Sequence, residues 1–132
     1  MKEIDWSSLS FGYMKTDYNV RCWYRNGAWG EIEVSSEETL NIHMAATCLH
    51  YGQEAFEGLK AYRCPDGKVR IFRMDENAAR LQSSCRGIMM PELPTELFEE
   101  MVTKVVRMNE AYIPPYESGA SLYIRPLLIG TG

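Results

Sequence analysis

The sequence has few of the side chains that build metal or redox sites. Its 132 residues include two histidines, His43 and His50, and four cysteines, none of which forms a Cys-x-x-Cys pair. A structural zinc site needs four ligands at short, characteristic spacings, and this pattern does not supply them. We therefore expect the cysteines to be free thiols, as they are in cytosolic proteins.

The sequence also lacks the features of secreted, membrane-spanning and nucleic-acid-binding proteins. Residues 1–10 contain no apolar stretch typical of a secretory signal, and no apolar run approaches the length that crosses a bilayer. The net charge of −4 and the scattered basic residues argue against a face that displaces counterions from nucleic acid. We expect a cytoplasmic protein that binds neither membranes nor nucleic acids.

Two common catalytic patterns are absent as well. No Ser-His-Asp or Cys-His arrangement is recognisable, and no Gly-x-Gly-x-x-Gly loop is present to cradle a phosphate. A phosphate group, if the protein binds one, must therefore be held by another device.

The composition is that of one folded domain, and the patterns of strands and helices predict the α+β class. The apolar fraction is 45% and the charged fraction 24%, which is typical of a soluble globular protein. Residues 20–24 alternate in strand fashion, the Asn26-Gly27 turn follows, and residues 29–34 are expected to return antiparallel. Residues 59–73 are expected to form a second hairpin around a Cys-Pro-Asp-Gly turn.

The sequence then takes a helical period. One apolar stripe is built from Ala78, Leu81, Cys85 and Ile88, with Asp75 or Asn77 as the candidate N-cap. Thr95 is the candidate cap of a second helix, whose stripe consists of Phe98, Met101, Val102, Val105 and Met108. We interpret this methionine-containing stripe as core packing. Residues 121–130 are nearly continuous in apolar residues and are expected to form a strand covered on both faces. An antiparallel sheet with two main helices results.

Tyr123 and Arg125 are the strongest anomaly in the sequence. Because side chains alternate along a strand, the two would project to the same face. A guanidinium is almost never buried without a partner, and its planar fork can bind a carboxylate with two hydrogen bonds. The pair predicts a site for a carboxylate or another anion. The alternatives are an internal ion pair with one of the chain's own acids, or an arginine at the exposed end of the strand.

Two further groups of residues could carry chemistry. Arg80 lies beside a core position of the first predicted helix and is either a solvated arginine or a ligand for a phosphate. Residues 50–52 and 56–58 read His-Tyr-Gly and Phe-Glu-Gly. Their glycines permit close backbone approach to a ligand, and their aromatic rings offer an apolar wall. The alternative is a short buried turn that leads into the second hairpin, and His50 is interpreted as structural.

Several segments together resemble one enzyme family. Residues 50–62 match the pattern H-Y-x-x-x-x-F-E-G-x-K-A-[FY], and residues 121–126 match S-L-Y-[VI]-R-P. Further matches are residues 69–73 with Arg80 eight positions after Phe72, and Phe11-Gly12 followed by Thr16-Asp17. These features resemble the fold-type IV pyridoxal-phosphate enzymes, specifically the smaller N-terminal domain of the branched-chain amino acid aminotransferases. The fold that this implies is the D-amino acid aminotransferase-like fold.

The resemblance implies a role for individual residues. Arg80 would bind the phosphate of pyridoxal 5'-phosphate (PLP), and Gly58 would approach the substrate through its backbone. Arg125 would meet the distal carboxylate of glutamate or 2-oxoglutarate. Four aromatic residues would line the pocket for the side chain of leucine, isoleucine or valine: Phe11, Tyr51, Phe56 and Tyr123. The Tyr51 position would reach the partner subunit's site in a homodimer.

The resemblance also implies what these residues do not supply. In the family, the Schiff-base lysine and the acidic partner of the pyridine nitrogen lie in the larger C-terminal domain, and the sequence ends before either position. We therefore expect residues 1–132 to be the small domain of a longer transaminase, without catalytic residues of its own, inactive alone and not retaining PLP. The alternatives are a non-catalytic dimerisation or association module, and half of another fold-type IV enzyme such as a D-amino acid aminotransferase or aminodeoxychorismate lyase.

Overall fold

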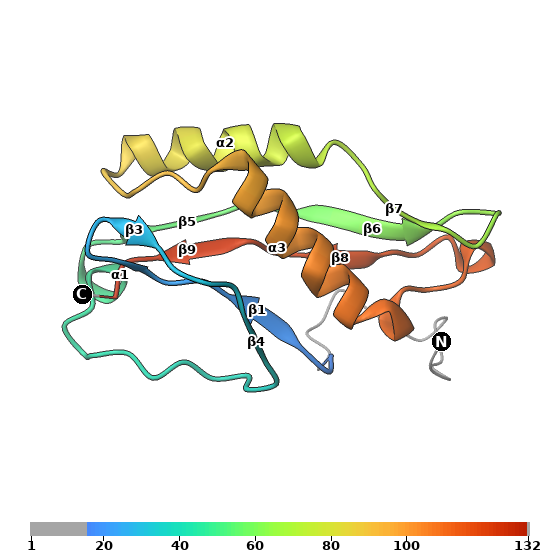
Figure 1. Ribbon diagram of the computed structural model, residues 1–132, viewed down its shortest axis with the longest axis horizontal. Helices are drawn as coiled ribbons and strands as arrows, with labels where there is room; N and C mark the ends of the chain where they lie inside the picture. The colour runs from blue at the N-terminus through green and yellow to red at the C-terminus, as the bar shows by residue number, and fades with distance from the viewer. Residues whose placement is uncertain (1–15, 132) are drawn as a thin grey trace.

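Short antiparallel strand pairs and two main helices make up the fold, which the computed structural model describes for residues 16–131 (Figure 1). The α+β class predicted from the sequence is confirmed. The β-structure is divided into several short ladders, however, and does not form one continuous sheet.

The first hairpin forms around the predicted turn. β2 (Tyr24–Arg25) pairs with β3 (Ala28–Trp29), and β1 (Asn19–Arg21) pairs with β4 (Glu33–Ser35) further from the turn. Asn26 and Gly27 both have positive φ, 54° and 79°, which is the backbone conformation that a two-residue hairpin turn requires.

The second hairpin is also where the sequence predicts it. β6 (Leu59–Arg63) pairs with β7 (Val69–Ile71), and Gly67 in the connecting turn has a φ of 83°. A short helix, α1 (Thr47–His50), and β5 (Glu54–Phe56) precede it.

The last β-segment differs from its prediction, because it divides into β8 (Leu122–Ile124) and β9 (Leu127–Ile129). β8 pairs with β6 and β9 pairs with β5, in one register on both sides of a gap. The prediction of a strand covered on both faces is wrong, since Tyr123 is 39% and Leu127 53% exposed. Pro126 lies in the gap and lacks the N–H that would continue the ladder.

The first long helix, α2 (Met74–Gly87), buries three of the four residues of the predicted apolar stripe, whereas Ile88 follows the end of the helix and is partly buried. Ala78, Leu81 and Cys85 are buried. Neither Asp75 nor Asn77 is the N-cap, because the cap position is Arg73, which has a left-handed backbone and makes no side-chain capping bond. Asp75 lies within the first turn instead, and Asn77 is a buried helix residue.

The second long helix, α3 (Thr95–Met108), begins one residue earlier than expected. Its cap position is Pro94, so Thr95 is the first helical residue, and its hydroxyl accepts a hydrogen bond from Gln82 on α2 at 3.1 Å. Phe98 and Val102 are buried as predicted, whereas Met108 is 38% exposed. Two 3-10 turns, η2 (Glu110–Tyr112) and η3 (Tyr116–Ser118), lead from α3 to β8.

The two long helices pack on one side of the β5–β9 and β6–β8 strand pairs. α2 runs along β5, and α3 contacts both α2 and β1 (Figure 1). The buried core joins both helices to β6 and β8 through Leu81, Phe98, Leu59 and Ile124. None of the helices described has the length and apolar character needed to cross a membrane.

The four cysteines are free thiols. Burial raises the pKa of the Cys85 thiol, and the nearby Glu92 carboxylate adds to the effect. A raised pKa keeps this fully buried side chain neutral, so it serves as a small apolar core residue.

We predict that the core depends strongly on Phe98, which is 1% exposed. Phe98→Ala should lower the free energy of unfolding by about 3–5 kcal/mol, because it leaves a cavity that the core cannot fill. Phe72→Ala is the matched control, since Phe72 is 61% exposed, and should change it by less than about 1 kcal/mol. Urea titration measures both values, and equal losses would contradict this description of the core.

Candidate active site

The candidate site is built at the gap between the strand pairs. Residues 57–58 separate β5 from β6, and residues 125–126 separate β8 from β9 directly opposite. The Glu57 N–H still donates to the Pro126 carbonyl at 3.0 Å, but proline cannot return the second bond. The Glu57 carbonyl therefore receives no ladder bond from Pro126, and the ladder is interrupted at this point.

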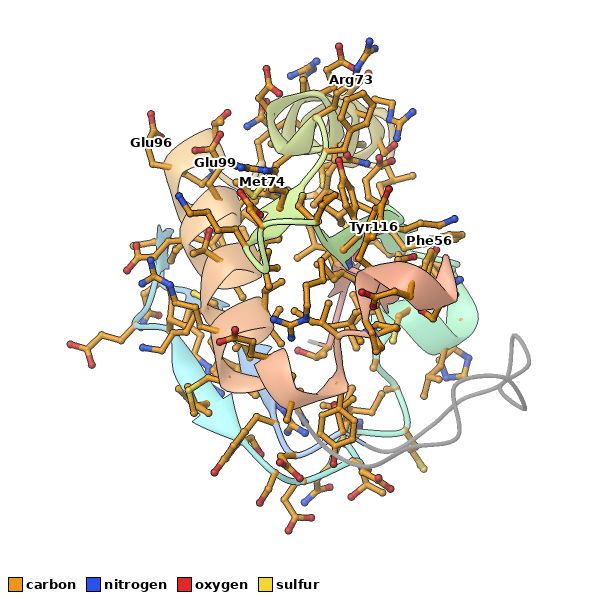
Figure 2. The ribbon with its side chains drawn as sticks, turned by 90° about the vertical axis from the view of Figure 1, so that its right-hand side faces the viewer. Phe56, Arg73, Met74, Glu96, Glu99 and Tyr116 are labelled. Carbon is orange, nitrogen blue, oxygen red and sulfur yellow. The ribbon has the colours of Figure 1, made fainter. Side chains whose placement is uncertain are left out.

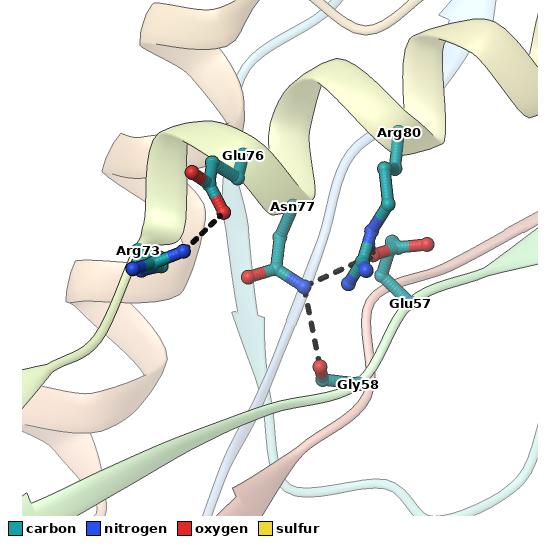
Figure 3. Close-up of polar contacts among 6 residues, drawn as sticks. All are labelled: Glu57, Gly58, Arg73, Glu76, Asn77 and Arg80. Carbon is teal, nitrogen blue, oxygen red and sulfur yellow. Dashed lines mark hydrogen bonds and ion pairs between the residues drawn. The ribbon is translucent and has the colours of Figure 1, made fainter.

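The Glu57 carboxylate joins this segment to α2. Its Oε1 accepts hydrogen bonds from Arg80 Nε at 2.9 Å and from Asn77 Nδ2 at 3.0 Å, and Arg80 Nη2 lies 2.8 Å away (Figure 3). Asn77 Nδ2 also donates to the Gly58 carbonyl at 3.2 Å. The Glu57 side chain is 12% exposed and Asn77 is buried, so the Asn77 bonds are partly buried, whereas the Arg80 side of the carboxylate is exposed.

Arg80 retains unused donors despite this ion pair. Glu57 occupies the Nε and Nη2 side of the guanidinium, while Nη1 makes no hydrogen bond to any residue that the structure describes. The Arg80 side chain is 67% exposed. A guanidinium has five N–H donors in a fixed fork, so Arg80 can hold Glu57 and still meet an anion from solvent.

Phe56, Tyr123 and Arg125 meet on the other face of the same strands, because side chains alternate along a strand. The Arg125 guanidinium carbon lies 4.7 Å from the centre of the Phe56 ring and 5.5 Å from that of the Tyr123 ring. Arg125 Nη2 also donates to the Tyr123 hydroxyl at 3.4 Å. The sequence prediction that Tyr123 and Arg125 share a face is therefore confirmed. Figure 2 shows Phe56 on the side of the molecule away from Glu96 and Glu99 of α3.

Arg125 has no acidic partner within residues 16–131, so the described part of the chain does not offer the internal ion pair that was the alternative. The other alternative holds in part, since Arg125 follows the end of β8 and is exposed. Its guanidinium is nevertheless held by the two aromatic rings. Cation–π contact of this kind orients the group and leaves its N–H donors available to a carboxylate.

Gly58 lies between the Glu57–Asn77–Arg80 cluster and the Phe56–Tyr123–Arg125 cluster. A Cβ built on Gly58 would collide with the Tyr123 hydroxyl and would lie 2.9 Å from Tyr123 Cζ, closer than carbon atoms approach without a shift. The carbonyl of the same glycine accepts the Asn77 bond. Only a glycine here leaves room for the Tyr123 phenol against the backbone that Asn77 holds.

Two predicted site residues do not join these clusters. Tyr51 lies before β5, at the opposite end of that strand from Phe56, and is 82% exposed. The alternative of a buried turn at residues 50–52 is therefore wrong. His50 Nε2 lies 2.7 Å from the Met44 carbonyl, a contact in keeping with a structural role. Phe11 lies outside the described residues.

One cavity among the described residues is a separate feature. It has a volume of about 670 Å³ and lies between α3, residues 18–24 and residues 122–131. Tyr123 and Arg125 border it, but Phe56, Gly58 and Arg80 do not. The cavity is therefore not the place where the predicted site residues converge.

Sequence reasoning missed the part played by Asn77 and Glu57. A signal was present, because Asn77 precedes Arg80 by three positions and therefore shares its helix face. The partner on the loop, Glu57, could not be assigned without the fold.

Comparison with known proteins gives a consistent result. The chain is 48% identical over 132 residues to a branched-chain-amino-acid aminotransferase of Haemophilus influenzae and 46% identical over 132 residues to that of Helicobacter pylori. All of this chain is matched in both cases, but it spans only 38% and 39% of the length of those relatives. No protein-family model matches the chain.

Solved structures of the same enzymes share the fold. A branched-chain amino acid aminotransferase from Escherichia coli aligns with a TM-score of 0.64 at 30% identity, over 88% of this chain and 34% of the other. The T.th. enzyme, complexed with N-(5'-phosphopyridoxyl)-L-glutamate, aligns with a TM-score of 0.64 at 29% identity, over 90% of this chain and 35% of the other.

Sequence and fold therefore agree on the family: this chain is the counterpart of the N-terminal part of the branched-chain amino acid aminotransferases, which are fold-type IV enzymes.

Proposed function

We propose that residues 1–132 form the small domain of a PLP-dependent transaminase that exchanges amino groups between leucine, isoleucine or valine and 2-oxoglutarate. The observation that carries the proposal is Arg125, whose guanidinium stacks on Phe56 beside the Tyr123 hydroxyl without an acidic partner among the described residues. The similarity to branched-chain enzymes over all 132 residues favours this substrate class over that of other fold-type IV enzymes.

Arg80 fits the phosphate of the cofactor. Its guanidinium is held on Glu57 and is still 67% exposed, with the Nη1 end available. An arginine fork facing a phosphate dianion makes charge-assisted hydrogen bonds, which are the strong kind. PLP, when bound, supplies the electron sink for the reaction at the substrate amino group. The residues of this chain then bind and orient the cofactor and the substrate.

Arg125 and Tyr123 allow one pocket to accept both an apolar and an acidic amino acid. An entirely aromatic pocket would accept leucine and reject glutamate, because burying an unpaired carboxylate is very costly. Arg125 provides a pairing group at one wall, and its donors can bind the distal carboxylate in a bidentate manner. Phe56 and the ring of Tyr123 provide the apolar walls for the branched side chain. The free energies with which such apolar walls bind leucine, isoleucine and valine differ by only about 1–3 kcal/mol per methylene.

The exposure of Tyr51 fits a contact with a further part of the protein. Tyr51 is 82% exposed on a short loop with a positive-φ Gly52, a position from which it can enter the site of a second subunit. Phe11, by the family resemblance, is assigned to the pocket that receives the branched side chain. We propose a cytoplasmic homodimer in which a C-terminal domain covers Phe56, Tyr123 and Arg125.

A polypeptide limited to residues 1–132 should not exchange amino groups between leucine and 2-oxoglutarate, because it carries no PLP-binding lysine in the family's position. Adding the C-terminal domain in trans should restore turnover. Robust turnover by residues 1–132 alone would refute the proposal that the C-terminal domain supplies the PLP-binding lysine. A defined oligomer by light scattering, with no restoration and no PLP affinity, would favour an association module.

Arg125→Ala in the full-length enzyme should separate the two half-reactions. We expect kcat/KM for glutamate to fall about 10- to 100-fold, the cost of losing charge-assisted hydrogen bonds to a carboxylate. The value for leucine should change much less. Arg107→Ala, an exposed arginine at the end of α3, is the control and should leave both values unchanged. Equal losses for both substrates would count against the carboxylate role.

Gly58→Ala should displace Tyr123, since the added Cβ cannot fit against the phenol ring. We expect KM to rise about tenfold for both substrates, because a small misplacement of the wall weakens both binding modes. Gly87→Ala is the matched control, since a Cβ there meets no atom within 4 Å. Unchanged steady-state kinetics of Gly58→Ala would show that Tyr123 does not form the wall.

A further inference from the structure

Asn77 is an unusual residue for its place in α2. It is 5% exposed and faces the loop between β5 and β6, whereas the other buried residues of this helix are apolar (Figure 3). A buried amide is costly unless its hydrogen bonds are made. Both protons of its Nδ2 have an acceptor, one in the Glu57 carboxylate at 3.0 Å and one in the Gly58 carbonyl at 3.2 Å.

These two bonds fix the carboxylate on which Arg80 rests. Glu57 Oε1 receives Arg80 from the solvent side and Asn77 from the buried side. A carboxylate held by Arg80 alone could rotate about its side-chain bonds and carry the exposed arginine with it. Asn77 removes that freedom, because its second bond ties it to the backbone of Gly58. The arginine side chain then loses less conformational entropy when a ligand binds.

The same bonds reduce an electrostatic conflict. Glu57 is an anion close to the group that would receive a phosphate, and like charges repel. Arg80 and Asn77 both donate to Oε1, so its negative charge is dispersed over hydrogen bonds directed away from the exposed end of Arg80. The guanidinium can therefore remain attractive to a second anion.

We propose that Asn77 is a positioning residue for the cofactor phosphate: through Glu57 and Gly58 it fixes the Arg80 guanidinium in the orientation that receives the phosphate. The inference rests on the proposed function, in which Arg80 makes that contact. It assigns Asn77 no contact with the cofactor itself.

The test measures the affinity of the full-length apoprotein for PLP and for pyridoxal, which lacks the phosphate. Asn77→Ala should weaken PLP binding about tenfold and change pyridoxal binding by less than about twofold. Asn109→Ala is the matched control, because Asn109 is the other buried polar residue described, 3% exposed, and bonds to Tyr18 and Val105. It should leave the ratio of the two affinities unchanged.

A double-mutant cycle shows whether Asn77 acts through Arg80. Arg80→Ala should itself lower PLP affinity, and Asn77→Ala should then add less than about twofold. A full additional loss in the Arg80→Ala background would overturn the proposal, as would equal losses of PLP and pyridoxal affinity. If Arg80→Ala leaves PLP affinity unchanged, the assigned phosphate contact fails first. If it lowers the affinity and Asn77→Ala does not, only the positioning role fails.

Asn77→Asp keeps the test decisive if the alanine variant does not fold. It preserves the size of the side chain, but a carboxyl group can donate to Glu57 only when it is protonated. Its loss of PLP affinity relative to the wild-type protein should therefore shrink between pH 8 and pH 6. A loss that does not change with pH would contradict a role based on hydrogen-bond donation.

Discussion

The Glu57 carboxylate is the contact on which the rest of the site depends. It lies at the point where two strand pairs are interrupted, and it receives Arg80 from the exposed face of α2 and Asn77 from the buried face. Glu57 therefore fixes the distance between the helix that would hold a phosphate and the strands that would hold a substrate. In the proposed enzyme, this distance determines where the cofactor lies relative to the carboxylate-binding wall.

The interruption itself follows from the residues that occupy it. Pro126 cannot donate to Glu57, and Gly58 leaves the space that the Tyr123 ring fills. Strand register is the same on both sides, so the gap opens the ladder without shifting which side chains share a face. Phe56, Tyr123 and Arg125 consequently gather on one side of the molecule, away from α3. Gly58 lies opposite Arg125 at a position that makes no ladder bond, so its carbonyl is available to Asn77.

Local patterns in the sequence were sufficient for the hairpins and the helix stripes. Asn26-Gly27 favours a tight turn with positive φ, which is observed, and Leu81 and Cys85 lie at the spacing of one helix face. The helix caps could not be predicted in this way. Asp75 and Asn77 are favourable capping types, yet the chain begins α2 at the strained Arg73 and uses Asn77 inside the fold. The division of residues 121–130 was also missed, although Pro126 was the available signal. Tyr123 and Arg125 were placed correctly because alternation along a strand is a local property, whereas the long-range pairing of Glu57 with Arg80 depends on tertiary packing.

In the proposed enzyme, residues 56–58 hold the phosphate-binding Arg80, through Glu57, and the carboxylate-binding Arg125, through Phe56, in fixed relation. A crystal structure of the full-length protein with a phosphopyridoxyl-glutamate adduct tests it most directly. We expect Arg80 to keep its bonds to Glu57 while its Nη1 end meets the phosphate, and Arg125 to meet the distal carboxylate of the glutamate moiety. An adduct whose phosphate lies away from Arg80, or an Arg125 turned to an acidic residue of the protein, would contradict the account.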